Sequence, residues 1–293
     1  MRFKLGRKHD LAAQDTPGAP ATKEKKEDSF PVFLLKLALV VFIFRSFVFS
    51  PFSIPSESML PRLLIGDYLL ASKWSYGYTR YSLPFDLPLI PGRIMASTPD
   101  RGDVVVFKAP PTQKLDYIKR VIGLPGDQIQ MQGGVLFING APVPKERIDD
   151  FVQPVTQNMI DAAALDGRPS PCAGAQFEDR DIDANLSCRY PRYRETLPEG
   201  VQYEVLDLTT TPQDDTPVFT VPQGHVFMMG DNRDNSEDSR FPAEVGRGIA
   251  MVPMENLVGR ATVMMWSTDG SAQWLAPWTW FTAARWNRIG GTF

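Results

Sequence analysis

The amino-acid sequence predicts a mostly β protein with an antiparallel sheet, preceded by one apolar helix. Pro and Gly account for 26 and 22 of the 293 residues, a high share that favours short strands and turns over long helices. Strands and helices do not alternate regularly, as they would in a parallel sheet. Short β-rich runs bounded by turn signals occupy residues 68–74, 103–109, 117–123, 134–140, 202–208, 226–231 and 258–266.

The apolar residues from Phe30 to Phe52 predict a membrane anchor over residues 29–52. As a helix this stretch would be about 34 Å long, enough to cross a bilayer. Its two charged residues, Lys36 and Arg45, each lie close enough to one end to reach the headgroups. A buried core helix and a cleaved secretory signal are the alternatives.

The charge distribution predicts an orientation for this anchor. The chain has 31 Lys/Arg and 34 Asp/Glu, a formal net charge of −3, so no overall basic excess points to nucleic acid. Lys23, Lys25 and Lys26 directly precede the apolar run. By the positive-inside rule we expect residues 1–28 in the cytoplasm and residues 53–293 outside.

The part after the anchor divides into a β core and an insertion. Residues 53–140 and 217–293 contain most of the β-rich runs, whereas residues 141–216 are polar and interrupted by Pro, so we interpret them as an inserted second lobe. This lobe contains Cys172 and Cys188. A disulfide between them would suit an oxidising compartment and would add about 3 kcal/mol of stability. Two free thiols are the alternative.

The C-terminal part is rich in tryptophan, which is typical either of a membrane interface or of ordinary core packing. Five of the six Trp residues are Trp266, Trp274, Trp278, Trp280 and Trp286.

Histidine chemistry is restricted, because His9 and His225 are the only histidines. A metal site built from several histidines is therefore excluded, and His-dependent catalysis would have to use His225. The G-x-S-x-G, S-x-x-K and H-E-x-x-H motifs are also absent.

Two serines follow the anchor, Ser56 and Ser58, between Pro55 and Pro61. In an extended segment residues i and i+2 point the same way. One hydroxyl could then attack a substrate while the other donates a hydrogen bond to the oxyanion. The alternative is a Ser-rich loop at the membrane exit.

Lys119 lies in the middle of the β-rich run 117–123. Strand alternation places it on the same face as Tyr117 and Val121. A lysine buried there would have a lowered pKa and could act as a general base. A solvated lysine next to Arg120 is the alternative.

The segment from Gly230 to Arg240 has charged or amide side chains at eight of its eleven positions. Such a segment is usually a solvated turn. Ion pairs involving Asp238 and Arg240 could instead tie the loop together and hold Ser236 in a fixed position.

Taken together, these motifs resemble the successive sequence boxes of bacterial type I signal peptidase, a serine peptidase with a Ser-Lys dyad. The matching segments, in order, are Ile54–Met59 after the apolar run, Arg101–Phe107, Tyr117–Asp127 and Gly230–Arg240. Four motifs in one order are far more selective than any one of them.

The resemblance implies a role for each matching residue. Ser58 would be the nucleophile, Lys119 its general base, and Ser56 an oxyanion donor together with the backbone N–H of Ser58. Ser236 would orient the lysine, and Asp238 and Arg240 would form a supporting ion pair. Pockets for small substrate residues would be lined by Met59, Leu63, Tyr117 and Ile118. No metal or cofactor is implied.

The implied function is that of a monomeric, membrane-anchored endopeptidase of the bacterial cytoplasmic membrane, with its catalytic core on the extracytoplasmic side. It would remove signal peptides from translocated preproteins at Ala-x-Ala sites. A dedicated Ser-Lys maturation protease of the conjugation or pilin type, and an inactive envelope scaffold, are the alternatives. Arg62, where the family often has Thr, and a longer loop after Arg240 depart from the family pattern.

Overall fold

The computed structural model describes residues 29–273 and 275–293. The described residues divide into two units at residue 39/40, and the strands described all belong to the second unit. The residues before 29, and Trp274 with its predicted place among the tryptophans, lie outside the described part.

Helix α1, Phe30–Phe47, is the one helix in the described ranges that is long and apolar enough to cross a membrane. Phe, Leu and Val side chains are exposed along its whole length. The helix is shorter than the predicted anchor of residues 29–52, because Phe49–Ser53 forms strand β1 and pairs with β2. Pro51 has no N–H to donate, and it is tolerated here because β1 is an edge strand.

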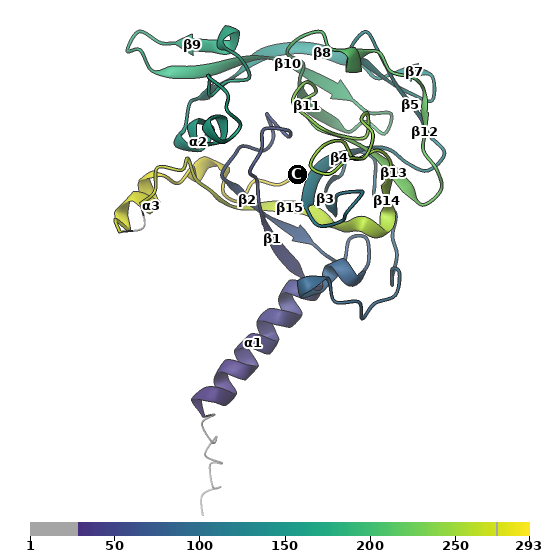
Figure 1. The fold of residues 1–293 in the computed structure, drawn as a ribbon, viewed down its shortest axis with the longest axis vertical. Helices are drawn as coiled ribbons and strands as arrows, with labels where there is room; N and C mark the ends of the chain where they lie inside the picture. Colours follow the sequence, from purple (N-terminus) through teal and green to yellow (C-terminus); the bar gives the residue numbers. More distant parts are fainter. Residues whose placement is uncertain (1–28, 274) are drawn as a thin grey trace, which may run out of the picture. The chain divides into compact units, whose positions relative to one another are not determined.

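The central element is a seven-stranded antiparallel sheet in the order β1-β2-β15-β3-β4-β13-β14 (Figure 1). The predicted mostly β, antiparallel fold is confirmed. After β1, the strands are β2 (Asp67–Ser72), β3 (Val104–Lys108), β4 (Asp116–Gly123), β13 (His225–Met229), β14 (Val252–Pro253) and β15 (Leu257–Ser267).

Apolar side chains cover both faces of this sheet, as the alternation along β3 illustrates. Val104 and Val106 contribute to one buried cluster together with Ile118 of β4. Val105 and Phe107 contribute to a second cluster. Runs of β-branched residues therefore occur where the sheet is buried on both sides.

Two further sheets have four strands each. The strand order of the first is β12-β5-β6-β7. The strand order of the second is β11-β10-β8, and β9 also pairs with β10. Their strands are β5 (Gln128–Gln132), β6 (Val135–Ile138), β7 (Ala141–Pro142), β8 (Lys145–Pro154), β9 (Glu178–Arg180), β10 (Leu186–Thr196), β11 (Gln202–Leu206) and β12 (Phe219–Thr220).

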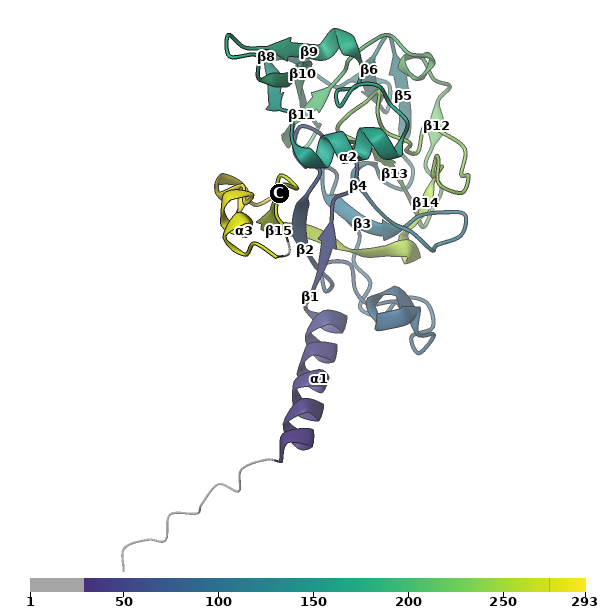
Figure 2. The same ribbon diagram turned by 60° about the vertical axis from the view of Figure 1, so that its left-hand side comes forward.

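The sheet of β8 to β11, which we call the lobe sheet, lies entirely within residues 141–216. Helix α2, Gln157–Leu165, lies beside it (Figure 2) and buries Met159 against Tyr190. A disulfide between Cys172 and Cys188, with 5.5 Å between the Cα atoms, lies in the same cluster.

One buried cluster joins all three sheets. Ile122 of β4, Leu136 of β6 and Val205 of β11 are its members, and each is fully or nearly fully buried. The lobe sheet is thus packed against the end of β4, the strand that carries Lys119.

Candidate active site

Ser58 and Lys119 are hydrogen-bonded. The Nζ atom of Lys119 lies 2.6 Å from the Oγ atom of Ser58, and the two residues are 4% and 8% exposed, respectively. The residues are far apart in the sequence and come from different elements, the turn after β1 and the middle of β4. A lysine amine and a serine hydroxyl at this distance can exchange a proton.

Burial lowers the pKa of Lys119 to about 8, because removal from water disfavours its charged form. The carboxylates of Asp238 and Asp231 act in the opposite direction and keep the pKa from falling further. About a tenth of Lys119 is therefore neutral at pH 7, far more than for an ordinary lysine, and a general base requires this form.

Ser56 contributes a second hydroxyl next to Ser58. Its Oγ atom lies 3.4 Å from that of Ser58, and the residue is exposed. The backbone is not extended here as the sequence interpretation assumed: it bends at Ser56 and turns from Ser58 onward, with a hydrogen bond from the N–H of Leu60 to the carbonyl of Glu57. The two hydroxyls are therefore brought together by the turn, and not by the alternation of side chains along a strand.

The loop from Gly230 to Arg240 is bound to the backbone around Ser58. The N–H of Asn232 donates to the carbonyl of Ser58 at 3.1 Å, and its side-chain amide donates to the carbonyl of Glu57 at 3.2 Å. Asn235 donates to the Glu57 carboxylate at 3.0 Å, and burial raises the pKa of this carboxyl group. The loop is therefore a bound part of the site and not a solvated turn.

Gly230 lets this loop approach Ser58 closely. A Cβ atom at this position would collide with the carbonyl oxygen of Ser58 and the hydroxyl of Ser236. Ser236 is buried, and its hydroxyl has no hydrogen-bond partner among the described residues, Lys119 included. The structure thus brings Ser236 to the backbone of Ser58 without a direct bond to the lysine.

Asp238 and Arg240 form a buried two-point ion pair within the loop. The Nε and Nη2 atoms of Arg240 donate to the two Asp238 oxygens at 2.9 and 3.0 Å. The N–H of Gly230 also donates to Asp238. Burial alone would raise the pKa of Asp238, but the Arg240 charge and these hydrogen bonds lower it overall. Its charge is therefore retained next to Lys119.

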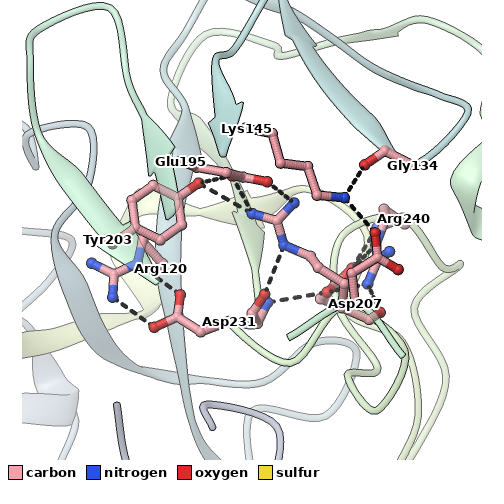
Figure 3. Close-up of polar contacts among 11 residues, drawn as sticks. Arg120, Gly134, Lys145, Glu195, Tyr203, Asp207, Asp231 and Arg240 are labelled. Carbon is pink, nitrogen blue, oxygen red and sulfur yellow. Dashed lines mark hydrogen bonds and ion pairs between the residues drawn. The ribbon is translucent and has the colours of Figure 1, made fainter. Parts of the chain in front are cut away.

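Further buried ion pairs attach the loop to β4 and to the lobe sheet (Figure 3). Arg120 donates to both carboxylate oxygens of Asp231 at 2.7 and 2.6 Å. Arg233 donates to both oxygens of Glu195, on β10, at 3.0 and 2.7 Å. Tyr203, on β11, donates to the same carboxylate at 2.6 Å. The sequence interpretation missed Glu195 and Tyr203, since neither lies in one of the matching motifs.

The four residues expected to line substrate pockets do not all lie together. Met59, Leu63 and Ile118 share one apolar cluster with Ile54. Tyr117 packs on the other cluster, with its ring 6.4 Å from that of Phe107. Alternation along β4 explains the separation, because Tyr117 and Ile118 are successive residues on a strand.

Within the described ranges, one group of three carboxylates could approach a metal ion, Asp207, Asp214 and Asp234. Lys145 already forms an ion pair with Asp207, and Asp234 accepts hydrogen bonds from two backbone N–H groups. Protein groups therefore occupy much of this cluster.

Comparison with known proteins identifies relatives over most of the chain. Residues 28–266 match the family described as "Signal peptidase, peptidase S26". The signal peptidase I of Rickettsia typhi is 34% identical over 253 residues, which cover 83% of this chain and 81% of that protein. The enzyme of the same name from Rickettsia conorii is 33% identical over 256 residues, 84% of this chain and 81% of that one.

A solved structure also aligns with part of the chain. It is the crystal structure of a signal peptidase I from Enterococcus faecalis V583, with 21% identity and a TM-score of 0.27. The alignment covers 57% of this chain and 98% of the other.

The Arg233–Glu195 pair yields a stability prediction. Glu195→Gln should lower the free energy of unfolding by about 3 kcal/mol, because Arg233 would remain buried without its counter-charge. Urea denaturation of the detergent-solubilised chain measures the change. Glu204→Gln is the matched control on the neighbouring strand: Glu204 is 39% exposed in its pair with Arg192, and its loss should cost less than about 1 kcal/mol. Equal effects of the two substitutions would contradict the prediction.

Proposed function

The chain belongs to the signal peptidase family, peptidase S26, whose members are serine endopeptidases that remove signal peptides, and we propose that it cleaves preproteins with a Ser58–Lys119 dyad. The observation that carries the proposal is the 2.6 Å contact between Ser58 Oγ and a buried Lys119 Nζ. Nucleophile and base are adjacent, and burial lowers the pKa of the base toward neutrality.

The reaction begins when neutral Lys119 removes the proton from Ser58. The Ser58 oxygen attacks the scissile carbonyl carbon, and the hydroxyl of Ser56 and the backbone N–H of Ser58 stabilise the oxyanion. The C–N bond then breaks, Lys119 gives the proton to the leaving amine, and an ester on Ser58 remains. Water, deprotonated by Lys119, attacks the carbonyl carbon of this ester. The bond to the Ser58 oxygen breaks, Lys119 returns the proton to Ser58, and the carboxylic acid product leaves.

The other matching residues support the dyad. The loop holds Ser236 near the Ser58 carbonyl, and its hydroxyl forms no hydrogen bond among the described residues, so it is free to orient Lys119. The Asp238–Arg240 pair fixes the loop and keeps a negative charge near Lys119. That charge stabilises the protonated lysine formed during attack.

The substrate would bind as an added β-strand, with small side chains before the cut, as at Ala-x-Ala sites. Strand β13 pairs with β4 from Arg120 to Gly123, so in the described structure residues 116–119 have no strand partner on that edge. An extended peptide can pair there. Its alternate side chains would reach the apolar cluster of Met59, Leu63 and Ile118, while Tyr117 would lie at the rim.

Substitution of either member of the dyad tests the proposal. Ser58→Ala and Lys119→Ala should each lower cleavage of a model preprotein by at least about 1000-fold, because nucleophile and base act as a unit. Product mapping by mass spectrometry gives the cut site, and urea denaturation verifies that the variants fold. Near-normal cleavage by either folded variant would disprove the dyad.

The pH dependence tests the role of the lysine. Because the neutral form of Lys119 is the base, kcat/KM should fall about tenfold per pH unit below a midpoint near 8. Lys73 is a second buried lysine whose pKa burial lowers to about 8, and it donates to backbone carbonyls away from the dyad. The Lys73→Met variant should show the same fall in kcat/KM below pH 8 as the wild type. A wild-type profile that is flat between pH 6 and 9 would contradict the proposed base.

We further propose that α1 anchors the chain in the bacterial cytoplasmic membrane, with residues 1–28 in the cytoplasm. Its exposed apolar side chains and length of about 27 Å fit a hydrocarbon core. Helix α3, Trp278–Thr282, also exposes aromatic side chains: Trp278 is 69% and Phe281 is 66% exposed. Such residues favour the membrane interface.

Protease accessibility in spheroplasts tests this topology. Protease added outside should digest residues 53–293 of the full chain, because they lie beyond the membrane. An N-terminal tag should remain protected until the spheroplasts are lysed, and a cytoplasmic marker protein controls for leakage. Digestion of the tag in intact spheroplasts, or protection of the body, would overturn the proposed orientation.

A further inference from the structure

A cavity of about 750 Å³ adjoins the segment that follows Ser58, and neither Ser58 nor Lys119 lines it. Pro61 and Arg62 line one side of it, and Arg120, the residue after Lys119, lines another. The lobe sheet contributes Arg194 and Tyr203. The cavity is therefore bordered by both segments that carry the dyad.

Most of the charges around this cavity are paired. Arg120 is neutralised by Asp231, and the lining acids Asp103, Glu199 and Glu204 pair with arginines. Asp100 is a lining acid with an exposed side chain and no ion pair in the described structure.

Two arginines of the cavity have no acidic partner in the described part of the chain. The guanidinium of Arg62 donates to the carbonyl of Thr292 and lies 5.4 Å from the centre of the Phe293 ring. The side chain of Arg194 forms no hydrogen bond or ion pair with any described residue. The cavity thus contains two guanidinium groups that no described carboxylate neutralises.

Burial and nearby arginines both disfavour the charged form of Arg62. Burial lowers the pKa of Arg62, and the charges of Arg120 and Arg288 lower it further, against the weaker opposite effect of Asp231 and Glu204. A bound anion would relieve this repulsion. Guanidinium groups bind carboxylates with paired, charge-assisted hydrogen bonds.

We propose that this cavity binds an acidic side chain of the preprotein within a few residues of the scissile bond, with Arg62 and Arg194 as the residues that select it. The inference rests on the proposed function, because the substrate is placed by its attachment to Ser58. A polypeptide is the favoured occupant, because Arg62 follows Ser58 by only four residues and Arg120 follows Lys119 directly, so both segments of the dyad border the cavity.

A panel of paired peptides tests the site. Each pair carries Glu or Gln at one of the three positions on either side of the cut, and the full-length enzyme is assayed in neutral detergent without lipid. At one or more positions Glu should raise kcat/KM about tenfold over Gln at low salt. This ratio should approach one in Arg62→Gln and in Arg194→Gln. The second variant removes a side chain without partners, so its fold should be preserved.

Arg180→Gln is the matched control, since Arg180 is an exposed arginine of β9 outside the cavity, and it should keep the wild-type ratio. Equal Glu/Gln ratios in wild type and Arg62→Gln at every position would overturn the site while leaving the proposed function intact. A lipid ligand would give a different result. Phosphatidylglycerol vesicles would activate the wild type but not Arg62→Gln, and the Glu/Gln ratios of the two enzymes would be equal. That outcome would overturn the proposal that a substrate side chain binds in the cavity. A wild type that cuts none of the peptides would overturn both.

Discussion

The geometry of the site depends on backbone hydrogen bonds between two segments that are far apart in the sequence. Ser58 lies in a short turn, and a turn of this kind has few internal contacts to fix it. The loop from Gly230 to Arg240 supplies them, through the N–H of Asn232 on the Ser58 carbonyl and its amide on Glu57. The loop is itself held by two-point ion pairs of Arg120 with Asp231 and of Arg240 with Asp238. The loop is rich in charged residues because it is buried, and each buried charge needs a partner of opposite charge.

The position of Lys119 could be predicted from local pattern, and the lobe contacts could not. Strand alternation placed Lys119 among buried neighbours, and this depends only on the two-residue period of a strand. Glu195 lies in a polar strand of the lobe, where spacing gives no sign that it faces inward. Alternation places Tyr203 on the inner face with Val205, but it does not specify which residue Tyr203 meets there. Their burial results from long-range packing against Arg233, a contact between elements that no local rule specifies. The helix also ends before the apolar run does, because residues 49–53 pair with β2 as a strand.

Ser56 and Ser58 lie next to each other as predicted, but for a different structural reason. An extended backbone was expected to align the two hydroxyls, and a bend followed by a turn brings them to 3.4 Å. The turn also exposes Ser56 while it buries Ser58. Under the proposed mechanism, the difference in exposure fits the difference in role: the oxyanion donor faces the incoming peptide, and the nucleophile stays beside its base.

The short connection between α1 and Ser58 limits where a substrate can be cut. Residues 48–58 can span at most about 40 Å when fully extended, and β1 already uses part of them for pairing. In an enzyme anchored through α1, this connection sets the greatest distance at which Ser58 can lie from the membrane surface. The enzyme would then measure distance as well as sequence: a matching site placed far along an exported chain would escape cleavage, whereas one just outside the bilayer would be cut.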